Sequence, residues 1–399
     1  MIVLYIFLLL VLLAVLLLFI PMKGRSYSVA VAERHRDERD TMFSRNEIQP
    51  GEQRFEDYYR MRPDNREKDD LFRSEPGLLN RDSRYYNRYA FASAEAGFET
   101  VELFFSARKG EEDGRGPGKD DDPARLTDFI KNWSAKLGAL DTGVALMRDY
   151  HFYTRGGRGD RYGKEVINDH KFGIALTVEM DHELTATGPQ SPVVMESAAQ
   201  YLRSAMIATQ LAVTLRKLGY SATTHIDANY DLICPLVARD AGLGEIGRMG
   251  LLMTPRHGPR VRIALITTDA PLLADKPGYD NSVIDFCMLC KKCSRVCPSA
   301  SIPWGERENH RGGLRWQINQ ESCFTYWCRV GTDCGRCMAV CPYSHKNNAL
   351  HNFVRWGIRN NFIFRRLAVK LDDISTAVSR LPAKHRNGRM MIDNILLLL

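Results

Sequence analysis

The sequence predicts an α/β or α+β fold for the central part of the chain, with an apolar segment before it and a cysteine-rich segment after it. Regular structure is clearest from about residue 124, where ARLTDFIKNWSAKLGA carries apolar residues at helical spacing. GIALTVEM (173–180) and RIALITT (262–268) have the composition of buried strands, and a long helix between them opens at Ser191 and closes at Gly219. Strands that alternate with helices are typical of such a core.

Composition narrows the class of protein. At 399 residues with 44% hydrophobic residues, the chain is long enough and apolar enough for one or two globular domains. The net charge of +7 is mild for this length, so we expect no nucleic-acid partner. Of the ten cysteines, Cys234 stands alone and nine fall between Cys287 and Cys341. A secreted disulfide scaffold would be short and studded with cysteines throughout, so this clustering indicates metal ligation.

The N-terminal segment predicts a membrane anchor. Residues 2–20 carry no charge, and as a helix they would be roughly 28 Å long, close to the thickness of the bilayer hydrocarbon. A cleaved signal peptide would need positive charge before the run and a shorter apolar core. Basic residues lie on the C-terminal side from Lys23 onward, which predicts a single-pass protein in the cell membrane whose body faces the cytoplasm. No twin-arginine motif precedes the span.

Four consecutive parts are expected along the chain. Prolines interrupt the segment after the anchor, which we expect to form loops and short helices around the core. The stretch KGEEDGRGPGKDDD (109–122) has almost nothing to bury and predicts an exposed loop. The predicted boundaries are 1–22 for the anchor, 23–284 for the α/β domain, 285–346 for the cysteine-rich domain and 347–399 for a C-terminal helical extension.

The first cysteine group has the spacing of an iron–sulfur segment. CMLCKKCSRVCP contains Cys287, Cys290, Cys293 and Cys297 followed by Pro298. This is the C-x2-C-x2-C-x3-C-P run of bacterial two-cluster ferredoxins, in which the fourth cysteine binds the other cluster. Iron in such clusters prefers soft, anionic thiolate ligands.

The second cysteine group departs from the ferredoxin pattern at one position. Cys334, Cys337 and Cys341 keep the spacing, but no cysteine lies three residues before Cys334. The missing ligand must come from Cys323 or Cys328, and Cys323 is preferred. Zinc sites would take four ligands from one local unit, often with histidine, and would not need this arrangement. The sequence therefore predicts two 4Fe–4S clusters, one held by Cys287, Cys290, Cys293 and Cys341, the other by Cys297, Cys334, Cys337 and one of the two candidates.

A glycine-rich stretch upstream formally matches a dinucleotide fingerprint. AGLGEIG (241–247) fits G-x-G-x-x-G, but the residues before it, CPLVARDA, look helical, whereas the fingerprint should follow a strand. We therefore reject nicotinamide or flavin binding on the Rossmann pattern.

The order of these features resembles the corrinoid-dependent reductive dehalogenases over roughly residues 145–345. A long helix with Tyr201 leads to RKLGYSA (216–222), then to ARDAGLGEIGRMGLLMTPRHGPRVRIALITTDAPL (238–272), then to the cysteine segment. The cysteine eleven residues before the next ligand, followed by GTDCGRC, is similar to that family's variant of the second group. The resemblance would make Cys323 the displaced ligand. The predicted membrane anchor, without a twin-arginine leader, departs from the respiratory members of the family.

The resemblance implies a nitroreductase-like α/β core that binds base-off cobalamin beside the two 4Fe–4S clusters. It also implies reductive removal of halogen from an organohalide, with Tyr201 as proton donor and Arg260 or Arg262 as its cationic neighbour. Arg260 is preferred, and Asn229 is a weaker polar candidate. Electrons would come from a membrane quinol oxidase or a soluble ferredoxin or flavodoxin. Five residues of the glycine-rich stretch would cradle the corrinoid tail: Gly242, Gly244, Glu245, Gly247 and Arg248.

Two alternative functions share some of these features. An epoxyqueuosine reductase, which modifies tRNA, would have the corrinoid core and both clusters. It typically has GLGWIGK where this chain has GLGEIGR, and an acid where this chain has Leu232. A membrane-bound iron–sulfur electron-transfer subunit without catalysis of its own would need only residues 285–345 and some scaffold, which leaves the long upstream domain unexplained.

Overall fold

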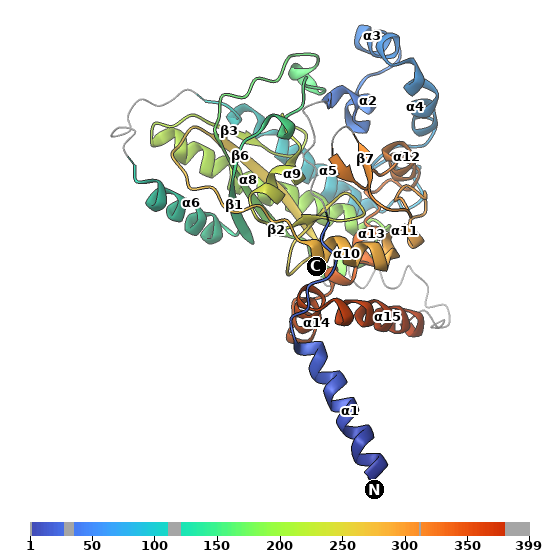
Figure 1. Cartoon of the computed structure of the whole chain (residues 1–399). Helices are drawn as coiled ribbons and strands as arrows, with labels where there is room; N and C mark the ends of the chain where they lie inside the picture. The colour runs from blue at the N-terminus through green and yellow to red at the C-terminus, as the bar shows by residue number, and fades with distance from the viewer. Residues whose placement is uncertain (1, 28–35, 111–120, 311–312, 380–399) are drawn as a thin grey trace. The chain divides into compact units, whose positions relative to one another are not determined.

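The computed structural model describes residues 2–27, 36–110, 121–310 and 313–379 (Figure 1). It divides into two compact units, each made from segments that are distant in sequence. The first unit joins residues 1–27, 281–290 and 345–399, and the second joins 28–280 and 291–344. This division differs from the four consecutive parts predicted, because tertiary contacts and not chain order define it. Most of the predicted loop over 109–122 lies outside the described residues.

The second unit is built around a four-stranded antiparallel sheet of order β1-β2-β6-β3. Its strands are β1 (Asp141–Leu146), β2 (Phe172–Glu179), β3 (Ala222–His225) and β6 (Val261–Thr268). The strands predicted at 173–180 and 262–268 are confirmed as β2 and β6. These two strands pair with each other, with Ile174 opposite Ile266 and Val178 opposite Arg262. The mixed α/β prediction is therefore confirmed, and the sheet is antiparallel throughout.

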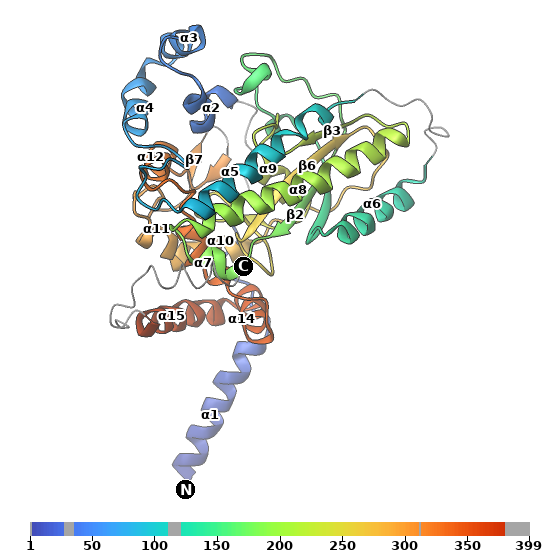
Figure 2. The ribbon, with the colours of Figure 1, turned by 180° about the vertical axis from the view of Figure 1, so that it is seen from behind.

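Helices cover both faces of this sheet. Ile174 and Leu176 share one apolar core with Leu211 of α8 (Pro192–Lys217), whereas Ala175 and Leu265 pack with α9 (Cys234–Asp240) in a second core. Successive side chains of a strand point to opposite faces, so one buried sheet requires an apolar layer on each side. Figure 2 shows α5 (Arg88–Glu102) and α8 running side by side along one face.

The long helix predicted between the two strands is confirmed as α8. Pro192 occupies its first turn, where the missing N–H costs nothing, and Gly219 follows its end with φ +90°, a conformation that favours glycine. The helix predicted from residue 124 is α6 (Pro123–Leu137), whose N-terminus is capped by the side chain of Asp122. Both boundaries agree with the sequence because caps and proline are local signals.

Shorter elements complete the second unit, including the short helices expected near the N-terminus. The α-helices are α2 (Met42–Glu47), α3 (Gln53–Met61), α4 (Arg66–Arg73), α7 (His182–Ala186), α11 (Lys292–Val296), α12 (Gln320–Val330) and α13 (Arg336–Ala339). Two small hairpins join β4 (Glu245–Ile246) to β5 (Leu252–Met253) and β7 (Glu308–His310) to β8 (Gly313–Arg315). The 3-10 helices are Glu38–Asp40, Pro63–Asn65, Phe105–Ala107, Asp149–His151, Gly159–Arg161 and Pro342–Ser344.

The first unit consists of four helices held by polar contacts at their ends. They are α1 (Ile2–Phe19), α10 (Asn281–Cys290), α14 (Ala349–Asn360) and α15 (Phe362–Ser379). The Asn361 amide donates to the carbonyl oxygens of Leu17 and Ile20, each at 2.8 Å, and so caps the end of α1. A buried ion pair between Asp285 and Arg365 joins α10 to α15.

The predicted membrane anchor is not supported. Among the described residues, no helix combines the length and the apolar character needed to cross a bilayer. α1 ends at Phe19 after 18 residues.

The substitution Gly143→Ala tests how closely β1 packs against the segment that follows α9. A Cβ on Gly143 would lie 2.0 Å from the Ala241 carbonyl oxygen, so Gly143→Ala must displace backbone. We expect it to lower the free energy of unfolding by about 1–3 kcal/mol, measured by chemical denaturation. Gly305→Ala is the control, because its Cβ would meet no atom within 4 Å. Equal stability of the two variants would contradict this packing.

Candidate active site and cluster thiols

Tyr201 and Arg262 come together where α8 crosses β6. The Arg262 guanidinium carbon lies 4.6 Å from the centre of the Tyr201 ring. Arg262 Nη2 also donates to the Ser197 hydroxyl and, at 2.7 Å, to Asp333 Oδ2. Ser197 precedes Tyr201 by four residues and therefore lies on the same face of α8. One cation thus connects a phenol, a hydroxyl and a carboxylate.

These groups, together with Asp227 and Cys234, are called the chamber below. Tyr201, Arg262, Asp227, Asp333 and Cys234 are each partly exposed, and the pKa of each is affected by burial and by a charge within this group. Arg262 Nε and Asp333 Oδ1 are buried and have no hydrogen-bond partner among the described residues. Because buried polar atoms are normally satisfied, the chamber suits a bound group with polar atoms.

Burial controls the protonation of the chamber. It raises the pKa of Tyr201 to about 12, while the nearby Arg262 cation opposes this rise and Asp227 and Asp333 add to it. Burial also raises the pKa of both carboxyls, although Arg262 lowers each of them in part. The phenol therefore keeps its proton at neutral pH, beside a cation that would stabilise the phenolate.

The geometry places Arg262 beside Tyr201 and gives Arg260 other partners. Arg260 is 1% exposed and its guanidinium binds Glu179 Oε1 at 2.8 Å, the Ser344 carbonyl oxygen at 3.1 Å and the Met180 carbonyl oxygen. Two residues that are two positions apart in a strand point to the same face. Arg260 lies just before β6 begins, so this rule does not apply to it and Arg262. It ties the end of β2 to residue 344.

The glycine-rich stretch packs against backbone. A Cβ on Gly242 would lie 2.8 Å from the Lys276 carbonyl oxygen, and one on Gly244 would lie 2.3 Å from the Met253 carbonyl oxygen. Gly247 donates its N–H to the Leu251 carbonyl oxygen at 2.9 Å. The contacts at Gly242 and Gly244 explain why these two positions require glycine without any ligand.

Two charged residues of the same stretch reach neighbouring segments. Glu245 Oε2 accepts from the backbone N–H of Asp280 at 3.2 Å. Arg248 is fully buried and binds the carbonyl oxygens of Pro303 and Gly305, each at 2.7 Å. Its charge also lies close enough to Cys293 to oppose the rise in that thiol's pKa caused by burial. Arg248 thus connects the stretch to a predicted cluster ligand.

Asn229 does not contact Tyr201 through any described hydrogen bond. It closes a tight turn with Ile226, in which each backbone N–H reaches the other's carbonyl oxygen, at 3.0 and 3.3 Å. That turn carries Asp227, one of three chamber residues that the sequence alone did not single out. Ser197 had a signal, its helical spacing from Tyr201, and Asp333 had another, its place directly before Cys334.

The four thiols predicted to bind the second cluster lie near one another in the second unit, with Cys293 beside them. Burial raises the pKa of Cys337, and the neighbouring thiols of Cys334, Cys293, Cys323 and Cys297 raise it further, which requires these thiols to lie close to Cys337. Burial raises the pKa of Cys323 to about 12, with the Cys334 and Cys297 thiols adding to the rise, and it raises that of Cys334 to about 11, with Asp333 and Cys297 adding to it. Such thiols give up their protons when they bind a metal.

The competing cysteine, Cys328, lies on a different face of α12. It is 2% exposed and packs with Met42, Phe72 and Phe324 in an apolar cluster. Five residues separate it from Cys323, which is about 140° of rotation in a helix, so the two thiols cannot point the same way. This geometry favours Cys323 as the displaced ligand.

The remaining predicted ligands are divided between the units. Cys293 and Cys341 are buried in the second unit, and Cys287 and Cys290 are buried in α10 of the first. In the described ranges, no three histidine, cysteine or acidic side chains converge as a single metal ion would require. A cubane cluster binds one thiolate at each iron corner, so its ligands stand farther apart than those of a single ion.

Comparison with known proteins agrees with this geometry. Residues 286–345 match the 4Fe-4S dicluster domain family. A tetrachloroethene reductive dehalogenase of Sulfurospirillum multivorans is 36% identical over 207 residues, which cover 50% of this chain and 41% of that protein. Its counterpart from Desulfitobacterium hafniense is 37% identical over 196 residues, or 46% of this chain and 34% of that protein.

Solved structures share the fold. The catabolic reductive dehalogenase NpRdhA in complex with 3-bromo-4-hydroxybenzoic acid aligns with a TM-score of 0.72 at 23% identity, over 89% of this chain and 48% of that one. A structure described as suggesting a mechanism for B12-dependent dehalogenation aligns at 0.71 and 24% identity, over 89% of this chain and 49% of that one.

The chain therefore contains a 4Fe-4S dicluster domain within a fold that a solved structure of a B12-dependent dehalogenase shares. More specifically, the matched half of the chain is similar in sequence to tetrachloroethene reductive dehalogenases. The chain spans less than half the length of these relatives.

Arg260 is expected to be structural. Arg260→Gln should lower the free energy of unfolding by about 2–4 kcal/mol, because the carbonyl groups of Met180 and Ser344 lose their donor. Urea denaturation measures the change. Arg256→Gln is the matched control, an exposed arginine on the same loop. A stable Arg260→Gln protein would contradict the structural role.

Cys323 and Cys328 are expected to differ in iron binding. Cys323→Ser should lower the iron content from about eight toward about four per chain, because the second cluster loses a thiolate. Cys328→Ser should keep all its iron and lose only a little stability, since its thiol packs in an apolar cluster. Iron and sulfide assays on anaerobically purified protein decide between them, and the reverse pattern would make Cys328 the ligand.

Proposed function

We propose that this protein is a reductive dehalogenase that replaces a halogen substituent of an organohalide with hydrogen. The observation that carries the proposal is the Tyr201–Arg262 pair, because the same guanidinium binds Asp333, the residue directly before the predicted cluster ligand Cys334. The overall reaction consumes two electrons and one proton and releases halide.

The proposed cofactors are two 4Fe–4S clusters and base-off cobalamin. One cluster would use Cys287, Cys290, Cys293 and Cys341, and the other Cys297, Cys323, Cys334 and Cys337. Bound cobalamin would supply the strong reductant that cleaves the carbon–halogen bond. The chamber's unpartnered Arg262 Nε and Asp333 Oδ1 fit a large polar group, and the stretch from Gly242 to Arg248 is proposed to hold its tail.

Tyr201 is the proposed proton donor. Its raised pKa keeps the phenol protonated until the reaction creates a strong base at the carbon that loses the halide. Arg262 stabilises the phenolate that forms, and Ser197 and Asp333 hold the guanidinium over the ring. The protein thus stores one proton next to the site where it is needed.

The substrate class is proposed from the relatives. Two of them are described as acting on tetrachloroethene, and a solved structure holds a bromohydroxybenzoate. We propose a small organohalide as substrate. A membrane quinol oxidase, or a soluble ferredoxin or flavodoxin, is the proposed electron donor.

The first test is the cofactor content of anaerobically purified protein. We expect about one corrinoid and about eight irons per chain, and halide release in a screen of haloalkenes and halophenols with a chemical reductant. Eight irons without corrinoid, even after reconstitution with cobalamin, would instead leave an electron-transfer protein.

The proton donor is tested by substitution. Tyr201→Phe should lower the rate of halide release at least about 100-fold while corrinoid and iron stay bound, because proton transfer by a positioned side chain contributes that much. Tyr220→Phe, which removes a phenol that binds Asp121 outside the chamber, is the control. Since the pKa of Tyr201 is raised to about 12, its ionisation should cause no loss of rate between pH 7 and 9. A full rate in Tyr201→Phe would sink the assignment.

A further inference from the structure

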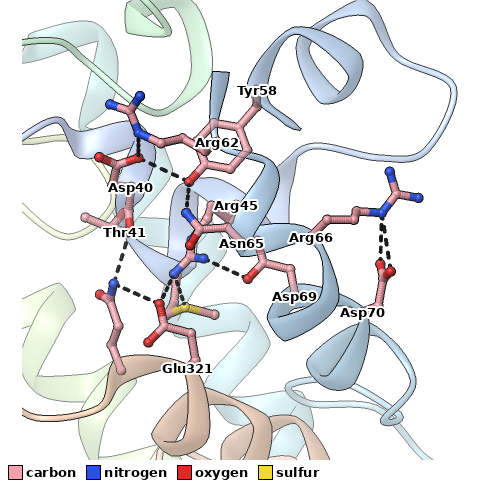
Figure 3. A network of polar contacts seen from close by, with 12 residues as sticks. Asp40, Thr41, Arg45, Tyr58, Arg62, Asn65, Arg66, Asp69, Asp70 and Glu321 are labelled. Carbon is pink, nitrogen blue, oxygen red and sulfur yellow. Dashed lines mark hydrogen bonds and ion pairs between the residues drawn. The ribbon is translucent and has the colours of Figure 1, made fainter. Parts of the chain in front are cut away.

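A buried ion network joins the N-terminal helices to α12 (Figure 3). Arg45 of α2 is 0% exposed, and its guanidinium donates to Asp69 Oδ1 of α4 at 2.8 Å and to Glu321 Oε1 of α12 at 2.5 Å. Asp69 is also fully buried, and 24% of the Glu321 side chain is exposed. Helices α2, α3 and α4, residues 42–73, are called the N-terminal clamp below.

Further hydrogen bonds fix the network inside the clamp. Asp69 Oδ2 accepts from the Tyr59 hydroxyl of α3 at 2.8 Å. Arg73 donates to the Tyr59 oxygen at 2.6 Å and to the Arg45 carbonyl oxygen at 2.7 Å. A buried charge is tolerated only when it is paired and hydrogen-bonded, and such a network allows few other geometries.

Apolar side chains of the clamp also pack against the face of α12 that carries Glu321. Phe324 lies edge-on to Phe72 of the clamp, with ring centres 5.2 Å apart, and Cys328 joins both in one cluster with Met42. Glu321, Phe324 and Cys328 are spaced at i, i+3 and i+7, which places them on a single face of a helix. The clamp therefore fixes how α12 is rotated about its own axis.

Cys323 lies on the other side of that helix. Cys323 follows Glu321 by two positions and directly precedes Phe324, so the 100° step of the helix turns it away from the face that contacts the clamp. The neighbouring Ser322 hydroxyl contacts the Ser301 hydroxyl at 2.8 Å, and the Ser301 N–H donates to Cys297 Sγ at 3.3 Å, which places this part of α12 beside a predicted ligand of the same cluster. In the ferredoxin pattern the equivalent ligand comes three residues before the next and is held by the same loop. Here Cys323 comes eleven positions before Cys334, and the local loop cannot orient it.

We propose that the N-terminal clamp positions Cys323 for the second 4Fe–4S cluster through the Arg45–Asp69–Glu321 network. The proposal rests on the assignment of Cys323 as a ligand. Arg45 touches no thiol, so it is a positioning residue: it holds α12 at the rotation that presents Cys323 to the cluster. The clamp replaces, by long-range contacts, the orientation that a short loop supplies in ferredoxins.

The test compares full-length variants with intact clusters. Arg45→Met removes the cation at the centre of the network, and Glu321→Gln removes only the charged contact with α12. Asp70→Asn is the matched control, because Asp70 neighbours Asp69 on α4 but forms an exposed pair with Arg66. Iron and sulfide content, circular-dichroism melting and a redox titration followed by electron paramagnetic resonance are measured. Cys323→Ser identifies the signal of the second cluster.

In Arg45→Met and Glu321→Gln we expect the signal of the second cluster to be lost, converted to a three-iron signal or shifted in midpoint potential. The first cluster should keep its signal, and Asp70→Asn should match the unchanged protein. Where Arg45→Met does not fold, Glu321→Gln decides, since it keeps the Arg45–Asp69 pair.

Two results would overturn the proposal. If Arg45→Met and Glu321→Gln melt at lower temperatures but keep both cluster signals unchanged, the clamp only stabilises the fold and does not position Cys323. Eight irons in Cys323→Ser would remove the ligand on which the proposal depends. Neither result requires substrate or corrinoid, so both are independent of whether the protein dehalogenates.

Discussion

The Arg262 guanidinium joins the parts of the second unit on which the candidate site depends. It starts from β6, lies over the Tyr201 ring of α8 and binds Asp333, the residue before Cys334. Without this cation, Tyr201 would lose its electrostatic partner and Asp333 would be a buried carboxylate without a counter-charge. The pairing of β2 with β6 sets where Arg262 lies, since Val178 of β2 stands opposite it. The register between β2 and β6 therefore also determines which side chains meet in the chamber.

Burial gives the chamber its chemical character. In water a phenol and a carboxyl would titrate near their ordinary values, but here desolvation favours the neutral form of Tyr201, Asp227 and Asp333. Arg262 limits the effect without reversing it. A chamber with a protonated phenol and a fixed cation suits chemistry that must receive a single proton and exclude bulk water.

In the proposed set of cluster ligands, one cysteine lies on a helix and not in the tight loop of the ferredoxin pattern. A ligand in a tight loop is oriented by a few neighbouring backbone angles, whereas a ligand on a helix turns with the whole helix. The rotation of α12 is fixed by Arg45 and Phe72, residues far from it in sequence. The proposed ligand on α12 thus depends on the helices before residue 74, because they fix the rotation of α12.

Much of this protein followed from local sequence signals. The ends of α8, the two central strands and the presence of a 4Fe-4S dicluster domain were predictable, because capping, periodicity and cysteine spacing act within a few residues. Tyr201 came from the family resemblance, and its place on α8 agrees with that prediction. Ser197 could have been found from its helical spacing to Tyr201.

Other features were decided only by tertiary structure. The sequence could not separate Arg260 from Arg262, because their roles depend on where β6 begins and on which elements pack beside it. It could prefer Cys323 but not explain how the cysteine is oriented, because Arg45 and Glu321 are 276 positions apart. The sequence also did not show which segments of the chain pack into the same compact unit. Helix caps, strands and ligand motifs can be predicted from the spacing of residues in the sequence, because they depend on neighbouring residues. The pairing of distant side chains depends on how the whole chain packs.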